Sequence, residues 1–139
     1  MSKKITAPVI LLIVLSFAGC AAAAYTDGEY TGISGKDDKG AYGEVTITIK
    51  DGKVADCRFV TYQKDGTIKG ENYGKVNGTI SNQDYYEKAQ LAIRAMAQYE
   101  REYNQSKDLD KVNAVSGATN SYDQFIEAVE NALAAARKE

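Results

Sequence analysis

Histidine and tryptophan are absent from the 139 residues of this chain, and proline occurs only once. Without an imidazole the chain has no histidine general base, no histidine metal ligand and no histidine-ligated haem. Any redox function then needs an organic cofactor or a metal held by oxygen ligands alone, and we predict no metal site. Because the single proline is Pro8, no proline interrupts a helix or strand in the rest of the chain.

A basic surface is also lacking. The chain has 17 lysine and arginine residues against 19 acidic ones, a net charge of −2. Proteins that bind nucleic acid present a basic face that neutralises phosphates. We therefore expect no nucleic-acid partner, and no electrostatic attraction to an anionic membrane. The length favours a single domain.

The N-terminus has the pattern of an export signal. Lys3 and Lys4 precede an apolar run over residues 5–17. This run is shorter than the roughly 20 apolar residues that a transmembrane helix needs. A basic start followed by a short apolar run is typical of a secretory signal peptide.

The end of this run resembles a bacterial lipobox. Residues 17–20 read Phe-Ala-Gly-Cys, with phenylalanine where leucine is usual. We predict a lipoprotein signal peptide over residues 1–19, membrane lipid on Cys20, a tether over 20–26 and one domain over 27–139. The protein would then be lipid-anchored on the extracytoplasmic face of the cell membrane. The alternative is an ordinary signal peptide in which Cys20 has no such role.

The first half of the domain alternates between apolar and polar residues, as half-buried strands do. We predict strands over 29–33, 43–50 and 53–62, the last two joined by an Asp-Gly turn of the type that favours a tight hairpin. Cys57 lies in the third strand and is interpreted as a small buried hydrophobe, with a redox-active thiol as the alternative. The second strand places one apolar face toward the core, formed by Val45, Ile47 and Ile49.

The second half follows the 3.6-residue period of amphipathic helices. We predict helices from Asp84 to about Tyr103 and from Ser121 to about Arg137, after a polar loop over 63–83. Ser121 and the glutamine three residues later have the form of a capping box. Strands followed by helices predict an α+β fold, with two main helices packed against a small antiparallel sheet.

A cluster of small residues precedes the second helix. Residues 116–119 read Ser-Gly-Ala-Thr. The N-terminus of a helix offers unpaired N–H groups and the positive end of the helix dipole, which suit a phosphate. A threonine hydroxyl at that place can hold a phosphorylated ligand or become esterified to it. The alternative is a plain turn before a capped helix.

This segment resembles the motif of the FMN-binding domain family. The resemblance implies that Thr119 receives FMN as a covalent phosphoester from a separate flavin transferase, which uses FAD and magnesium. Ser116, Gly117 and Ala118 would form the shell around the phosphate. Asn113 stands where the family usually has an aspartate.

The resemblance implies an electron carrier, with a quinone-linked or flavin-bearing membrane oxidoreductase as the electron donor. Tyr73 is a candidate to stack on the flavin ring, and Lys75 is a candidate to place positive charge beside it.

One alternative to an electron carrier is a small flavin-dependent reductase component. The sequence shows neither a second domain for a substrate nor a convincing proton donor, so we favour a carrier without catalytic activity of its own. The other alternative is a lipoprotein that binds a ligand or partner without a cofactor.

Overall fold

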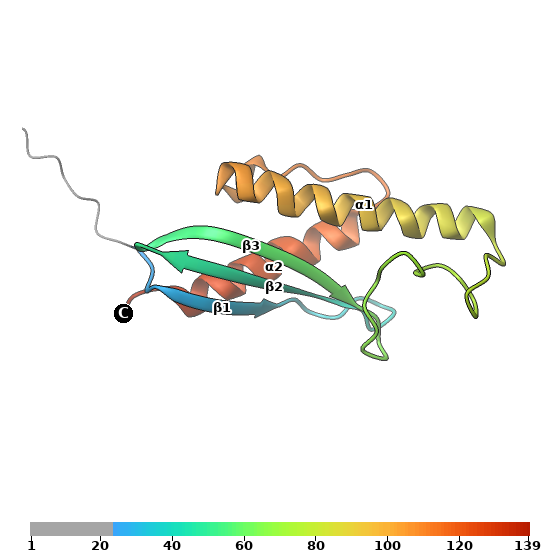
Figure 1. Ribbon diagram of the computed structural model, residues 1–139, viewed down its shortest axis with the longest axis horizontal. Helices are drawn as coiled ribbons and strands as arrows, with labels where there is room; N and C mark the ends of the chain where they lie inside the picture. The colour runs from blue at the N-terminus through green and yellow to red at the C-terminus, as the bar shows by residue number, and fades with distance from the viewer. Residues whose placement is uncertain (1–23) are drawn as a thin grey trace, which may run out of the picture.

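The computed structural model describes residues 24–139 as a three-stranded antiparallel sheet covered by two long helices (Figure 1). This arrangement confirms the predicted α+β fold. The predicted signal peptide and the predicted lipidation site at Cys20 lie outside the described residues. Among the residues described, no helix is both long and apolar enough to cross a membrane. The elements are β1 (Gly28–Ile33), β2 (Tyr42–Lys50), β3 (Lys53–Tyr62), α1 (Gln83–Ser106), the short 3-10 helix η1 (Leu109–Lys111) and α2 (Thr119–Ala136).

The β2–β3 hairpin has the predicted antiparallel pairing. Lys50 is paired with Lys53 across a two-residue turn, in which Asp51 and Gly52 have φ values of 53° and 72°. Positive φ at both central residues is the geometry that matches the twist of paired strands. The carboxylate of Asp27 accepts hydrogen bonds from the N–H groups of both turn residues, at 3.0 and 2.8 Å, and these bonds lower the pKa of Asp27.

The core lies between the sheet and the helices, as the strand pattern predicts. Phe125 of α2 is fully buried at its centre, with the rings of Phe59, Tyr99 and Tyr103 at 5.0 to 6.1 Å. Cys57 is also fully buried, and burial raises the pKa of its thiol to about 12. Its complete burial in the apolar core confirms its interpretation as a small hydrophobe, and the raised pKa makes the thiol a poor nucleophile. The predicted apolar face of β2 is buried here too, at Val45, Ile47 and Ile49.

Helix side chains cover both free edges of the sheet. Along β3, Asn104 of α1 accepts a hydrogen bond from the N–H of Cys57 at 2.9 Å and donates one to its carbonyl at 2.7 Å. Beside β1, Asn131 of α2 donates to the carbonyl of Ile33 at 2.8 Å. These bonds use backbone groups that would otherwise be open to a strand of another molecule.

One glycine allows α2 to approach the sheet closely. Gly32 of β1 is buried against α2, and a Cβ at this position would overlap the carbonyl oxygen of Ala128 and the backbone nitrogen of Ala132. Because both of these are backbone atoms, no change of rotamer would relieve the overlap. The contact between β1 and α2 therefore requires glycine.

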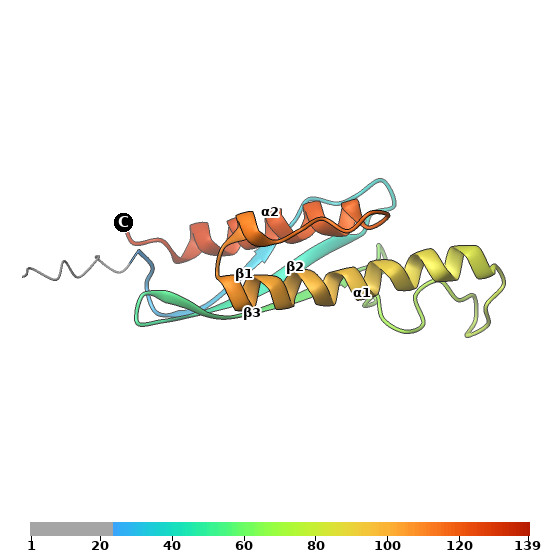
Figure 2. The same cartoon turned by 90° about the horizontal axis from the view of Figure 1, so that it is seen from above.

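The two helices run in the same direction, because residues 107–118 return alongside them (Figure 2). The N-terminus of α2 consequently lies beside the first half of α1. The opposite end of α2 lies close to the start of the described chain, where the N–H of Thr26 donates to the carbonyl of Ala136 at 2.8 Å and Tyr25 forms a bridge with Arg137. The start of α2 therefore lies at the opposite end of this helix from the N-terminal segment (Figure 1).

Candidate functional site

The Ser-Gly-Ala-Thr segment leads directly into α2, which begins at Thr119. The predicted start at Ser121 was therefore two residues late, and the predicted capping box is wrong. Ala118 is the N-cap residue, and no side chain makes a capping hydrogen bond. Ser121 lies buried in the first turn, and the Gln124 side chain donates instead to the carbonyl of Ala41 at 3.1 Å. Packing against the sheet has drawn both polar residues inward.

The turn before α2 is held by Tyr99, a residue that the sequence analysis did not select. Its fully buried hydroxyl accepts a hydrogen bond from the N–H of Val115 at 3.0 Å and donates one to the carbonyl of Ala118 at 3.2 Å. Gly117 lies between these two residues with a φ of +84°, in the left-handed region that favours glycine. The position of the turn therefore depends on a side chain of α1.

The first turn of α2 is open to an anion. Thr119 and Asn120 are exposed. Within residues 24–139, the backbone N–H groups of Thr119, Asn120 and Ser121 have no hydrogen-bond acceptor. Such groups, at the positive end of a helix dipole, suit a phosphate. The structure thus gives Thr119 an exposed hydroxyl beside three free donors.

A cleft of about 460 Å³ opens beside this turn. Of the four residues of the motif, three line the cleft and Ser116 does not. The remaining lining residues come from the β1–β2 connection, the loop over 63–82 and the first half of α1. They are Asp37, Asp38, Lys39, Lys69, Tyr73, Tyr85, Lys88, Ala89 and Ala92, together with Asn120 and Ser121 of α2.

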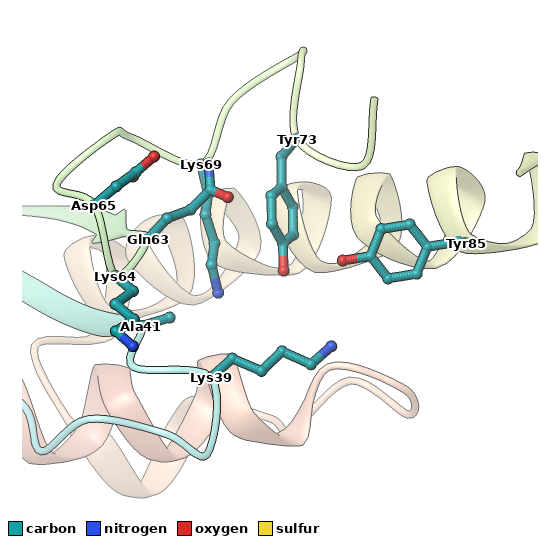
Figure 3. Close-up of a pocket in the computed structure, with 8 residues that line it drawn as sticks. All are labelled: Lys39, Ala41, Gln63, Lys64, Asp65, Lys69, Tyr73 and Tyr85. Carbon is teal, nitrogen blue, oxygen red and sulfur yellow. The ribbon is translucent and has the colours of Figure 1, made fainter. Parts of the chain in front are cut away.

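A second cleft of about 470 Å³ adjoins the first (Figure 3). The two clefts share four lining residues, which are Lys39, Lys69, Tyr73 and Tyr85. The ammonium group of Lys69 lies 4.9 Å from the centre of the Tyr73 ring, and that of Lys39 lies 5.6 Å from the centre of the Tyr85 ring. The depression beside Thr119 thus continues into a region with aromatic rings and positive charge.

Comparison with known families identifies the family of this chain. The model of the FMN-binding domain matches residues 39–134, which include the motif and most of the residues that line both clefts. The chain belongs to the FMN-binding domain family. FMN is therefore its cofactor, which favours the flavin hypotheses over a cofactor-free lipoprotein.

Among solved structures, the crystal structure of the CPE2226 protein from Clostridium perfringens resembles this FMN-binding domain. The two share 22% sequence identity with a TM-score of 0.61, over 81% of this chain and 88% of that chain. This likeness concerns the fold. A search of curated proteins gave no significant match.

The residues of the two clefts suit FMN. Both volumes fall within the roughly 300–1,000 Å³ of small-molecule sites. The free N–H groups at Thr119, Asn120 and Ser121 match the phosphate. Tyr73 and Tyr85 offer apolar faces to the flavin ring, and lysine side chains complement a negatively charged ligand.

Tyr73 and Thr119 line the same cleft, which is consistent with the prediction that Tyr73 stacks on the flavin ring. The carbonyl of Tyr73 accepts a hydrogen bond from Gln90 of α1 at 2.9 Å, which fixes the loop against the helix. Burial, followed by its interaction with Tyr85, raises the pKa of Tyr73 to about 12, so its hydroxyl is neutral at physiological pH.

Lys75, the lysine selected from the sequence, lines neither cleft. Its ammonium group lies over the Tyr86 ring, 5.7 Å from the ring centre, and it donates a hydrogen bond to Asn72 at 3.1 Å. The lysines in the shared region are instead Lys39 and Lys69. These two lysines could not be identified from their spacing in the sequence. Lys39 is in the β1–β2 connection and Lys69 in the loop over 63–82, and the fold alone brings them together.

Proposed function

We propose that this FMN-binding domain is an electron carrier on the extracytoplasmic face of the cell membrane, with FMN joined to Thr119 by a phosphoester. The observation that supports it is the place of Thr119, an exposed hydroxyl at the first position of α2 and at the edge of a cleft that suits FMN. Bound FMN accepts one or two electrons and so links two-electron donors to one-electron acceptors. The electron donor would be a quinone-linked or flavin-bearing membrane oxidoreductase.

Attachment requires a flavin transferase with FAD and magnesium. The Thr119 oxygen forms a bond to the FMN phosphorus, the bond between the two phosphates of FAD breaks, AMP leaves and the hydroxyl proton is released. The residues of this chain supply the acceptor and its surroundings. Gly117 lines the same cleft as Thr119, and Tyr99 fixes the turn that presents the hydroxyl.

Covalent attachment would serve a carrier outside the cytoplasm, where a dissociated flavin is lost by diffusion. The free N–H groups of Thr119, Asn120 and Ser121 would hold the phosphate in one orientation. Because α2 is anchored in the core through Phe125, this orientation is fixed relative to the rest of the domain.

The attachment can be tested on the wild-type chain co-expressed with a flavin transferase. We expect the denatured protein to gain the mass of FMN less one water and to fluoresce as a flavin in a denaturing gel. The same chain expressed without the transferase is the control and should gain no mass. A wild-type chain that gains no mass when transferase, FAD and magnesium are all supplied would contradict the proposal.

The lipid anchor can be tested separately. We expect the exported wild-type protein to begin at Cys20 and to enter the detergent phase on phase separation, because two or more acyl chains give stable membrane attachment. The Cys20→Ser variant should enter the aqueous phase. A mature protein that begins at any other residue would exclude the lipidation of Cys20.

A further inference from the structure

The region shared by the two clefts is separate from the motif that carries Thr119. It is formed by Lys39 in the β1–β2 connection, Lys69 and Tyr73 in the loop over 63–82, and Tyr85 in the first turn of α1. Figure 3 shows these four side chains around one space, with the Tyr85 hydroxyl pointing toward the hydroxyl end of Tyr73. Three distant segments of the chain thus converge on one pocket.

The charges of this pocket favour an anionic ligand. Lys69 is only partly exposed, and burial is the main cause that lowers its pKa. Asp37 acts in the opposite sense, and the neighbouring Lys39 adds a smaller lowering. An ammonium group that has lost part of its hydration, beside a second ammonium group, is stabilised when a ligand brings negative charge. The region shared by the two clefts therefore combines two ammonium groups, one of them partly desolvated, with two aromatic rings, while of the two clefts Asp37 lines only the one beside Thr119.

The phosphate of FMN does not need these lysines, because the free N–H groups at the start of α2 already suit it. With its phosphate on Thr119, the rest of the molecule would extend along the cleft into the adjoining region. Two-electron reduction of the flavin, with electrons from the donor and uptake of one proton, adds one negative charge to the ring. The region shared by the two clefts can accommodate this charge, because it contains Lys39 and Lys69.

On these grounds, and resting on the proposed function, we propose that Lys39, Lys69, Tyr73 and Tyr85 form the site of the flavin ring. The ring packs against Tyr73, and the ammonium group of Lys69 stabilises the charge of the reduced flavin. Lys69 thereby makes the flavin easier to reduce. It is a residue that sets the potential, and it forms no bond to the cofactor.

The first test compares the midpoint potentials of flavin-loaded variants, titrated with dithionite beside a reference dye. Mass spectrometry first confirms that each variant carries FMN. We expect Lys69→Met to shift the potential to a more negative value, by about 30 mV for each tenfold loss of preference for the reduced flavin. Lys75→Met is the matched control, since it removes the same charge from the same loop outside both clefts, and it should leave the potential unchanged. Equal potentials for Lys69→Met and wild type, or equal shifts for both variants, would overturn the proposal.

The second test needs neither the transferase nor the covalent bond. Free FMN is titrated against each protein, and binding is followed by the quenching of flavin fluorescence, which contact with a tyrosine ring increases. Tyr73→Leu and Lys69→Met should each weaken binding about tenfold, while Lys75→Met should bind as wild type does. Unchanged affinity in both cleft variants would overturn the ring site even if Thr119 carries flavin. A wild-type chain that binds free FMN in this way but never gains covalent FMN would contradict the proposed function and leave the ring site supported.

Discussion

Replacing Thr119 by valine is expected to abolish covalent flavin while leaving the fold intact. Valine has nearly the same shape as threonine but carries a methyl group in place of the hydroxyl, so no oxygen is present to form the ester. The side chain is exposed at the first position of α2 and makes no hydrogen bond within residues 24–139. Its replacement should therefore change the free energy of unfolding by about 0.5 kcal/mol or less.

The measurement is the mass and in-gel fluorescence of each variant after co-expression with the transferase. Thr31→Val, at an exposed position on β1, is the matched control and should carry as much flavin as wild type. Thr119→Ser keeps a hydroxyl and should keep some modification. Covalent flavin on Thr119→Val, with peptide mapping to Ser116 or any other residue, would show that Thr119 is not the acceptor.

The Gly32→Ala variant should lose about 3 kcal/mol of stability or more, the upper part of the range for an overfilled core. The added methyl group would overlap backbone atoms of Ala128 and Ala132, so α2 has to move away from β1 to admit it. That movement would disturb the packing of Phe125 and Val129, which are fully buried on the same helix. Urea denaturation followed by circular dichroism measures the change.

Gly70→Ala provides the control for this substitution. A Cβ at Gly70 would meet no atom within 4 Å. The change at Gly70 should therefore stay within about 1 kcal/mol, and restriction of the unfolded chain contributes part of it. If Gly32→Ala were as stable as Gly70→Ala, the close approach of α2 to the sheet would not be required for folding.

Local sequence patterns were sufficient to predict the sheet. The alternation of Val45, Ile47 and Ile49 identifies the buried face of β2, and Asp51-Gly52 alone determines the hairpin turn, since few residue pairs adopt positive φ twice. The start of α2 was predicted less well. Ser121 and Gln124 have the spacing of a cap, but contacts with the sheet override this local preference.

The surroundings of Thr119 were only partly predictable. The motif itself is continuous in sequence, so its relation to a helix start could be inferred. Tyr99, by contrast, reaches the motif from a different helix, and its hydroxyl is indistinguishable in sequence from those of the other tyrosines. The same holds for Lys39 and Lys69, which meet at the cleft only after the β1–β2 connection and the loop over 63–82 have folded.

The opposed ends of α2 have a consequence for how the carrier would exchange electrons. At 1.5 Å per residue, the 18 residues of α2 hold Thr119 roughly 27 Å from the end where the N-terminal segment joins the domain. If Cys20 carries the lipid, the predicted tether of residues 20–26, at no more than about 3.6 Å per residue, would reach less far than that helix is long. If α2 stood upright on a membrane, the domain would hold the flavin about the length of this helix away from the anchored end, toward a soluble or projecting acceptor. To receive electrons from a donor within the bilayer, the domain would have to tilt until α2 is parallel to the membrane surface. The tilt of the domain would then determine whether the flavin is near the donor or near the acceptor.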